Sequence, residues 1–335
     1  MKEIRQRPRI GIPRALLYYE YYPMWKTFFE HLGAQVVLSS PTNRQVLAAG
    51  SSRVVAETCL PVKVFMGHVL SLVGKCDYMF VPAIRSMEKR IHNCSKFLGL
   101  PDMTKAAVPE CPPILEPDID VDKGKRELYQ AIYKLGRHFT WDPLKVKKAS
   151  EAAWQAHQSY QAQMCLRGQT PLQAMEEMFT AGERGIGEGK SNFSFNIALI
   201  GHPYLLYDEH VNYRLLPRLE EAGARVFTTE MVDKGELDAF VTKLAGGPYW
   251  TYDDEVVGAG GYYLEREVDG VIGVVAFGCG PDSLMVDIVQ RYAKKRSKKP
   301  FMLLTLDEHS AETGFLTRLE AFLDMIQRRK KIKCA

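Results

Sequence analysis

Three cysteines stand beside residues that are typical of a strand end or a helix start: Cys59, Cys94 and Cys279. Two of them open the same pattern, a cysteine followed two residues later by a proline, at Pro61 and Pro281. Thiolates brought into one cleft from separate segments are the usual protein ligands of an iron–sulfur cluster. A cluster held by three thiolates keeps one iron open for chemistry. The three cysteines therefore suggest the ligands of a [4Fe-4S] or related cluster.

Each cysteine also has a plainer interpretation, which is the burial of a small apolar side chain in a tight turn. Repetition at matching positions favours ligation for Cys59 and Cys279, whereas the residues around Cys94 leave both interpretations open. Cys111, in a proline-rich loop, is the candidate for a fourth ligand, and Cys76 begins a strand, which favours burial. The chain has no Cys-x-x-Cys spacing, which counts against a zinc ribbon or a ferredoxin-type site.

Two further residues near the expected cleft could transfer protons. Glu57 lies two residues before Cys59, and His68 lies more than two turns into the helix expected after that cysteine. Both are candidate catalytic residues, and a packed histidine is the alternative for His68. Asp282 and Ser283 are expected to cap the helix that follows Cys279.

The elements that must position these residues are predicted by an internal repeat. The strand-like segment Ile10-Gly11-Ile12-Pro13 recurs as Ile200-Gly201-His202-Pro203, and Gly33-Ala34 recurs as Gly223-Ala224. The offset is 190 residues for both pairs (203 − 13 and 223 − 33). Short apolar strands alternate with helical segments in each copy, which is typical of parallel sheets covered by helices on both faces. We therefore predict an α/β fold with two Rossmann- or flavodoxin-like, doubly wound domains related by internal duplication.

The predicted domains are 1–140, which carries Cys59 and Cys94, and 191–335, which carries Cys279, with a helical connector over 141–190. Ligands of doubly wound sheets bind beyond the carboxyl ends of the strands. The cluster is therefore expected in a cleft between the two domains.

The composition limits the class of protein. Of 335 residues, 46% are hydrophobic and 25% are charged, as in a globular protein, and the net charge of +4 gives no reason to expect nucleic-acid binding. No apolar run is long enough to span a membrane, and the first residues lack the apolar stretch of a secretion signal, so we expect a cytoplasmic protein. Seven cysteines in a reducing compartment favour metal ligation or burial over a disulfide framework.

Four segments carry a family resemblance: Ile12-Pro13-Arg14-Ala15-Leu16, Glu57-Thr58-Cys59-Leu60-Pro61-Val62-Lys63, Asn93-Cys94-Ser95-Lys96-Phe97-Leu98-Gly99-Leu100-Pro101-Asp102 and Phe277-Gly278-Cys279-Gly280-Pro281-Asp282. Together they resemble the 2-hydroxyacyl-CoA dehydratase superfamily, in the branch of acyl-CoA dehydratase activase-related proteins. The resemblance implies paired Rossmann-like domains and a cluster held by two early cysteines and one late one, which matches Cys59, Cys94 and Cys279. A proline expected after the second cysteine is replaced here by Ser95.

The resemblance also implies a partner, an actin-like ATPase that acts as an activase and supplies single low-potential electrons. A homologous subunit or a second copy of the chain is a further expected partner. The predicted function is low-potential one-electron chemistry, either the reductive dehydration of a 2-hydroxyacyl-CoA by a lyase or another reduction. The alternative is a non-catalytic scaffold or electron-transfer subunit of such a complex. A third hypothesis is an ordinary ligand-binding protein in which the cysteines have no role.

Overall fold

The computed structural model describes residues 7–180, 193–297 and 299–334, with side chains up to residue 332. The chain divides into two compact units, which are described separately. Unit 1 comprises Met1–Ala162 and Tyr249–Thr251, and unit 2 comprises Gln163–Pro248 and Tyr252–Ala335.

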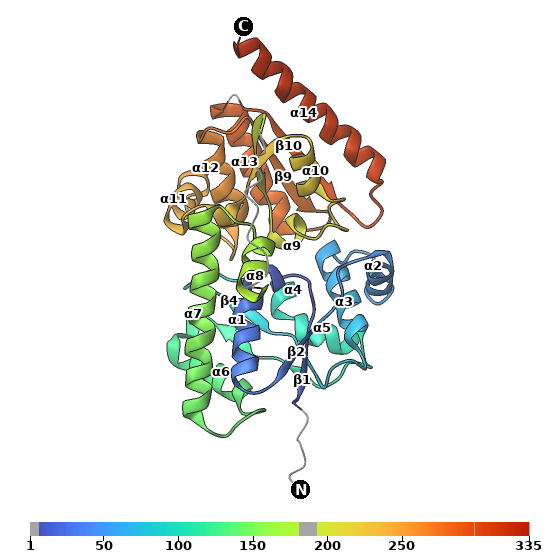
Figure 1. Ribbon diagram of the computed structural model, residues 1–335, viewed down its shortest axis with the longest axis vertical. Helices are drawn as coiled ribbons and strands as arrows, with labels where there is room; N and C mark the ends of the chain where they lie inside the picture. Colours follow the sequence, from blue (N-terminus) through green and yellow to red (C-terminus); the bar gives the residue numbers. More distant parts are fainter. Residues whose placement is uncertain (1–6, 181–192, 298, 335) are drawn as a thin grey trace. The chain divides into compact units, whose positions relative to one another are not determined.

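Unit 1 alternates strands with helices along the chain (Figure 1). Its elements are β1 (Arg9–Ile12), α1 (Tyr18–His31), β2 (Gln35–Leu38), α2 (Arg44–Ser51), α3 (Leu60–Leu72), β3 (Tyr78–Phe80), β4 (Ala83–Ser86), α4 (Ser95–Leu98), α5 (Leu100–Ala107), β5 (Ile114–Leu115), β6 (Asp118–Asp120), the 3-10 turn η1 (Val121–Lys123), α6 (Lys125–Gly136) and α7 (Pro143–Arg167), which passes into unit 2 after Ala162.

The main sheet of unit 1 is parallel, with strand order β2-β1-β3-β5, and β4 pairs with β6 in a small parallel sheet. Helix α1 covers the main sheet with aromatic side chains. The ring centroid of Phe80 on β3 lies 4.6 Å from that of Trp25 and 5.1 Å from that of Phe29. Helix α7 lies alongside α1 (Figure 1), where the hydroxyl of the fully buried Tyr160 donates to the carbonyl of Tyr19 at 2.5 Å. The aromatic face of α1 is thus buried between the sheet and α7.

Helices α2 and α3 approach each other so closely that only glycine fits at their contact. A Cβ atom on Gly67 would lie 2.0 Å from the carbonyl oxygen of Val46, and one on Gly50 would lie 1.9 Å from that of Lys63. Both obstacles are backbone atoms, which cannot rotate away. This contact fixes the course of α3, the helix that begins after Cys59.

Replacing Gly67 with alanine is expected to destabilise unit 1 by about 3 kcal/mol, because the added methyl group forces two packed helices apart. Urea unfolding followed by tryptophan fluorescence measures this loss, since Trp25, Trp141, Trp154 and Trp250 all belong to unit 1. The matched control is Gly99→Ala, whose Cβ would meet nothing closer than 3.4 Å. Equal unfolding midpoints for the two variants would contradict the role of the close contact.

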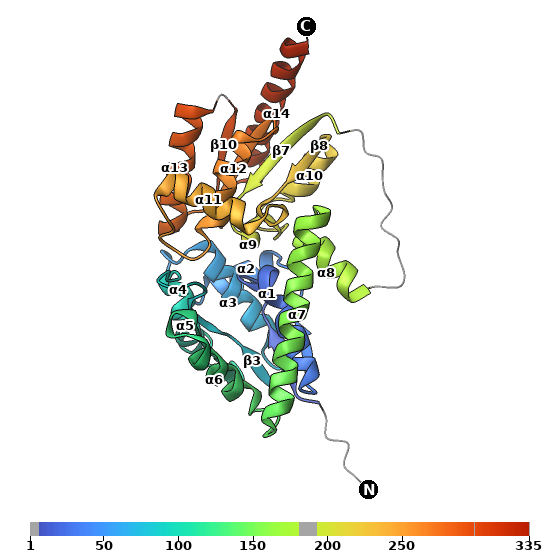
Figure 2. The same cartoon turned by 90° about the vertical axis from the view of Figure 1, so that its left-hand side faces the viewer.

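Unit 2 repeats the alternation of strands and helices (Figure 2). Its elements are α8 (Pro171–Thr180), β7 (Phe195–Ile200), α9 (Pro203–Leu206), α10 (Leu215–Glu221), β8 (Ala224–Phe227), the 3-10 turn η2 (Thr229–Met231), α11 (Lys234–Ala245), the π-helix η3 (Asp254–Gly258), α12 (Ala259–Glu265), β9 (Gly270–Ala276), α13 (Gly280–Arg296), β10 (Phe301–Leu306) and α14 (Glu312–Cys334).

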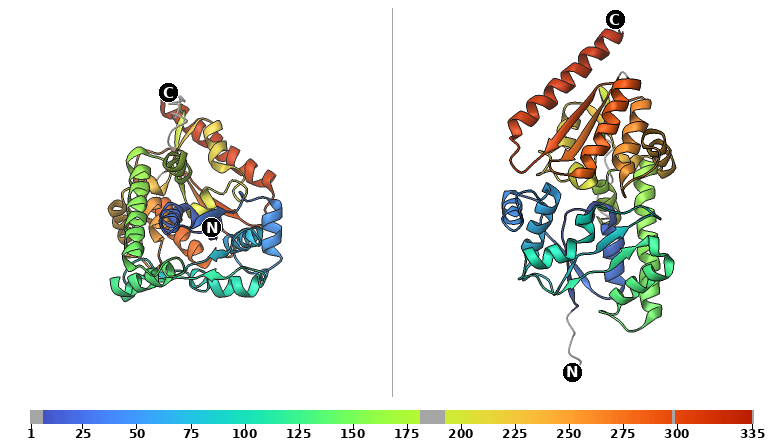
Figure 3. Two further views of the ribbon diagram at one scale, coloured as in Figure 1. Left: turned by 60° about the horizontal axis from the view of Figure 1, so that its bottom comes forward. Right: turned by 180° about the vertical axis from the view of Figure 1, so that it is seen from behind.

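Helices cover both faces of the unit 2 sheet, which is parallel with strand order β10-β9-β7-β8 (Figure 2 and Figure 3). On one face Phe322 and Ile326 of α14 approach Gly270 of β9. On the other face α12 and α13 pack against β7, where Gly260 lies against Val289 and Ile200. Two parallel sheets interleaved with helices confirm the predicted doubly wound α/β fold.

We number the strands of each four-stranded sheet by their order along the chain. Both sheets then have the same spatial order, which is second, first, third, fourth. In each unit the helix that precedes the second strand, α1 or α10, is followed by a glycine with positive φ, +91° at Gly33 and +83° at Gly223. This conformation is open to glycine at no steric cost, which explains why a glycine recurs at both helix ends. The common order places the loops after the first and third strands next to each other in both units.

The predicted connector over 141–190 contains α7 and α8, and its residues 181–190 lie outside the described part of the chain. Within the described ranges, no helix combines the length and the apolar character that a membrane span requires.

Candidate functional site

The three cysteines singled out in the sequence share one local structure. Each is the N-cap residue of a helix: Cys59 of α3, Cys94 of α4 and Cys279 of α13. Their ψ angles are 148°, 139° and 113°, all outside the helical range, and all three residues are partly exposed. Proline occupies the first turn after Cys59 and after Cys279, where its missing N–H costs no hydrogen bond. The N-terminus of a helix favours negative charge, which suits the binding of an anionic group there.

The segment before Cys59 is held by a buried lysine. Lys63, which is only 3% exposed, donates from Nζ to the carbonyl of Ala56 at 2.7 Å. The carbonyl of Cys59 accepts from the backbone of Val62 at 3.1 Å and from that of Lys63 at 3.3 Å. These bonds fix the entry of the chain into α3.

Cys94 is positioned by the loop that follows β4. Its backbone N–H donates to the side chain of Asn93 at 2.9 Å, and Asn93 donates from its own backbone to the carbonyl of Arg85 at 2.7 Å. The nearby His92 forms a parallel bridge with Trp250, and its carbonyl accepts from the backbone of Thr251 at 3.1 Å. A short segment distant in sequence therefore supports the loop that carries Cys94.

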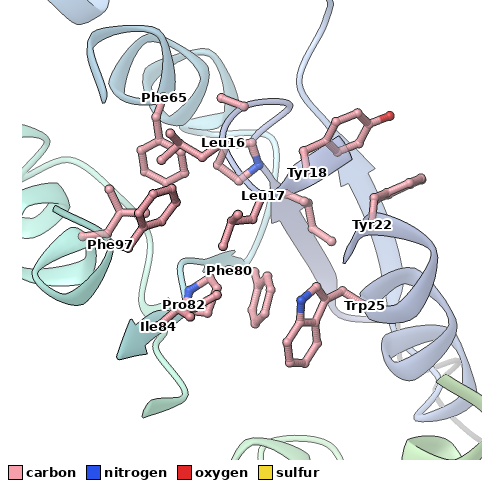
Figure 4. Close-up of a pocket in the computed structure, with 14 residues that line it drawn as sticks. Leu16, Leu17, Tyr18, Tyr22, Trp25, Phe65, Phe80, Pro82, Ile84 and Phe97 are labelled. Carbon is pink, nitrogen blue, oxygen red and sulfur yellow. The ribbon is translucent and has the colours of Figure 1, made fainter. Parts of the chain in front are cut away.

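Within unit 1, Cys59 and Cys94 belong to the same end of the sheet. Phe65, less than two turns after Cys59, and Phe97, three residues after Cys94, line one apolar cavity (Figure 4). Ile12 and Phe80, the last residues of β1 and β3, line it as well, which places it at the carboxyl ends of these strands. The cavity has a volume of about 50 Å³. This is smaller than the roughly 150 Å³ that holds a benzene ring, so the cavity admits only a few atoms.

In unit 2, Cys279 follows the carboxyl end of β9. Its backbone N–H donates to the carbonyl of Ala276 at 3.2 Å. Its carbonyl accepts from the hydroxyl of Ser283 at 2.7 Å and from the backbone of Ser283 at 3.3 Å. Cys279, rather than Asp282 or Ser283, is thus the N-cap of α13, which corrects the expected capping residues.

Cys111 and Cys76 lie at the amino end of the unit 1 sheet. Cys111 precedes β5 by three residues, and the carbonyl of Pro113, two residues after it, accepts from the backbone of Met79 at 3.0 Å. Burial raises the pKa of the Cys111 thiol to about 12, and burial also raises that of Cys76. Because Cys59 and Cys94 belong to the carboxyl end of the same sheet, Cys111 is not included in the ligand set proposed below.

The described residues contain no group of three or more His, Cys, Asp or Glu side chains arranged to hold a metal ion. None of the six cysteines whose side chains are described takes part in a disulfide. Two of the three N-cap cysteines belong to unit 1 and the third to unit 2. As donors they fit an iron–sulfur cluster, since each thiol is partly exposed at a helix N-terminus.

The two proposed acid–base residues differ in environment. Glu57 is exposed in the loop before Cys59. His68 is fully buried on α3, and its Nε2 lies 2.9 Å from the hydroxyl of Thr42. Burial, with a smaller contribution from the nearby Arg14, lowers the pKa of His68 to about 4, so its imidazole is neutral at pH 7.

Unit 2 contains a buried polar cluster that the sequence did not reveal. His202, the N-cap of α9, lies between two carboxylates: its Nδ1 contacts Glu255, and its Nε2 lies 2.7 Å from Asp282. Their exposed fractions are 5% for His202, 8% for Glu255 and 0% for Asp282. Asp282 also accepts from the backbone of Ala276 at 3.3 Å. The cluster joins the loops after β7 and β9 to the π-helix η3, a helix type that is frequent at functional sites.

The electrostatics of this cluster favour a charged histidine. Burial disfavours the imidazolium, but the carboxylates of Asp282 and Glu255 outweigh it and raise the pKa of His202 well above 6.5. Burial raises the pKa of Glu255, against the influence of His202. One signal in the sequence could have indicated the cluster: His202 occupies the position in the repeat that Ile12 holds in the first copy.

The buried histidines of unit 1 predict a loss of stability in acid. Burial lowers the pKa of both His68 and His157 to about 4. Between pH 6.5 and pH 4 the unfolded chain therefore binds protons on these two side chains that the folded protein does not bind. Stability is therefore lost as the pH falls from 6.5 towards 4, by up to roughly 3 kcal/mol per histidine. Urea unfolding at pH 7 and pH 5, followed by tryptophan fluorescence, tests this. In the variant His157→Gln, the difference in the free energy of unfolding between pH 7 and pH 5 should be about half as large. An unchanged difference would contradict the role of His157 in the acid sensitivity.

Comparison with known proteins identifies one family. The family described as CoA enzyme activase uncharacterised domain (DUF2229) matches residues 9–232, about two thirds of the chain. The matched range includes Cys59, Cys94 and His202 and ends before Cys279. No curated protein matches the chain. The matched family and its extent show that this chain belongs to the CoA enzyme activase uncharacterised domain family.

Proposed function

We propose that this chain binds a [4Fe-4S] or related iron–sulfur cluster through Cys59, Cys94 and Cys279. We further propose that it serves low-potential one-electron chemistry in a 2-hydroxyacyl-CoA dehydratase-like system, as a member of the activase-related branch of that superfamily. The electrons would come from a separate actin-like ATPase, and the chain would work with a homologous subunit or a second copy of itself. The family match supports the link to a CoA enzyme and activase system.

One observation carries the proposal: the three cysteines occupy the same N-cap position in three helices. Cysteines that are merely buried have no reason to share it, and Cys76 does not. At an N-cap, the first backbone N–H groups of the helix have no partner within the helix, and they can donate to a thiolate or to a bound anionic group. Two such sites lie at the carboxyl end of the unit 1 sheet, where doubly wound folds bind their ligands.

The residues named in this proposal have separate roles. The thiolates hold the cluster, Lys63 fixes the segment before Cys59, and Glu57, exposed beside it, is the proposed proton-transfer group. His68 remains the second acid–base candidate. When bound, the cluster supplies one-electron reduction at low potential.

Purification without oxygen, followed by iron and sulfide analysis and by electron paramagnetic resonance after reduction, tests the proposal. The expected result is a brown protein with roughly four iron and four sulfide ions per chain. A colourless protein with normal circular dichroism after anaerobic reconstitution with iron and sulfide would contradict it.

A further inference from the structure

A second group of polar side chains in unit 1 does not include the proposed cysteine ligands. It comprises residues of the loops that follow β1 and β2 together with His68 of α3. The backbone N–H of Arg14 donates to the hydroxyl of Ser39, which is 4% exposed, at 2.8 Å. Three residues later in the same loop, Thr42 contacts His68 at 2.9 Å. One loop therefore anchors both Arg14 and His68.

The positive charge of Arg14 has no counter-ion in the described part of the chain. No carboxylate forms an ion pair with it there, and its Nε is shielded from solvent without a hydrogen-bond acceptor. The guanidinium instead lies over the ring of Tyr18, with Cζ 5.5 Å from the ring centroid. A shielded guanidinium N–H without an acceptor costs free energy, which an anionic acceptor would recover.

His68 presents a second unsatisfied atom. The residue is 0% exposed, its Nε2 is engaged by Thr42, and its Nδ1 has no partner among the described residues. If the hydroxyl of Thr42 donates to Nε2, the neutral ring carries its proton on Nδ1 and can donate from there. Arg14 is close enough to lower the pKa of His68. A cationic donor and a neutral donor thus lie in the same polar group.

We propose that Arg14 and His68 bind the anionic oxygen atoms of a small carboxylate or phosphate ligand at the carboxyl ends of β1 and β2. Arg14 supplies the charge and the Nε donor, and His68 supplies the Nδ1 donor. The ligand is small because the surrounding residues are buried or half-buried. This site requires neither an iron–sulfur cluster nor the three cysteines.

The experiment uses the full chain with ¹⁵N-labelled histidine, titrated with sodium phosphate and, separately, with sodium acetate at constant ionic strength. The His68 resonances, assigned by their loss in His68→Gln, are expected to shift and to saturate with one of the two anions or with both. Saturation by phosphate alone or by acetate alone identifies the source of the anionic group. His157 is the internal control, because it is also buried with an unpartnered Nδ1 in the described part of the chain, but it lies against the Tyr21 and Trp154 rings.

The variants separate charge from geometry. Arg14→Gln should weaken binding by about 10- to 100-fold, the usual contribution of a hydrogen bond to a charged group. Arg14→Lys should weaken it less, because it keeps the charge but loses the planar fork. Arg9→Gln is the matched control, since Arg9 pairs with Asp77 at 2.9 Å at the amino end of the sheet. A His68 spectrum that neither anion shifts, or an equal response in Arg14→Gln, overturns the proposal.

Discussion

Replacing Cys279 with serine is expected to remove most of the iron and sulfide that the anaerobically reconstituted chain binds. The change is nearly isosteric, and the helix start keeps its backbone bonds to Ala276 and Ser283, so the fold should survive. In the proposed ligand set, this change removes one of three thiolates, the one that belongs to unit 2. Iron and sulfide analysis, with electron paramagnetic resonance of the reduced protein, measures the loss.

The matched control for this change is Cys165→Ser. Cys165 is also partly exposed, but it lies within α7 rather than at an N-cap, so its replacement should leave the iron content unchanged. Cys111→Ser should likewise leave it unchanged, because that thiol lies at the amino end of the unit 1 sheet. Full iron content and an unaltered spectrum in Cys279→Ser would exclude Cys279 from the ligand set.

Replacing His202 with leucine is expected to destabilise unit 2 by about 3–5 kcal/mol. The change leaves Glu255 and Asp282 buried without their shared cation, and an unpaired buried charge is more costly than the intact cluster. Hydrogen–deuterium exchange of β7 and β9 is the suitable measurement, because all tryptophans belong to unit 1. His309→Leu is the control, since that side chain is 84% exposed.

The same cluster gives unit 2 a pH dependence of opposite sign to that of unit 1. The native pKa of His202 is raised, so its contribution is fully present below pH 6.5 and is lost as the pH rises through the native value. After division by the intrinsic base-catalysed exchange rate, the protection of β7 and β9 should therefore fall in mild alkali, and His202→Leu should remove that dependence. If Glu255→Gln and Asp282→Asn fail to restore stability to His202→Leu, the loss arises from packing rather than from unpaired charge.

Local patterns in the sequence predicted the scaffold because they depend on near neighbours. Apolar residues at strand and helix spacing, with a glycine stop at Gly33 and again at Gly223, indicated two doubly wound parallel sheets. A proline two residues after Cys59 and after Cys279 marked each cysteine as the residue before a helix, and the structure has both as N-caps. For these features, composition and spacing were sufficient.

Contacts between distant segments depended on the tertiary structure. His202, Glu255 and Asp282 look singly like a turn residue, a loop residue and a helix cap, and only the pairing of β7 with β9 and the course of η3 brings them together. The sequence predicted that Cys111 lies in a loop near the cluster site. The parallel pairing of β3 with β5 instead places Cys111 at the amino end of the sheet. A sequence records the order of its residues and their local preferences, whereas burial and charge pairing arise from chain segments that only folding makes neighbours.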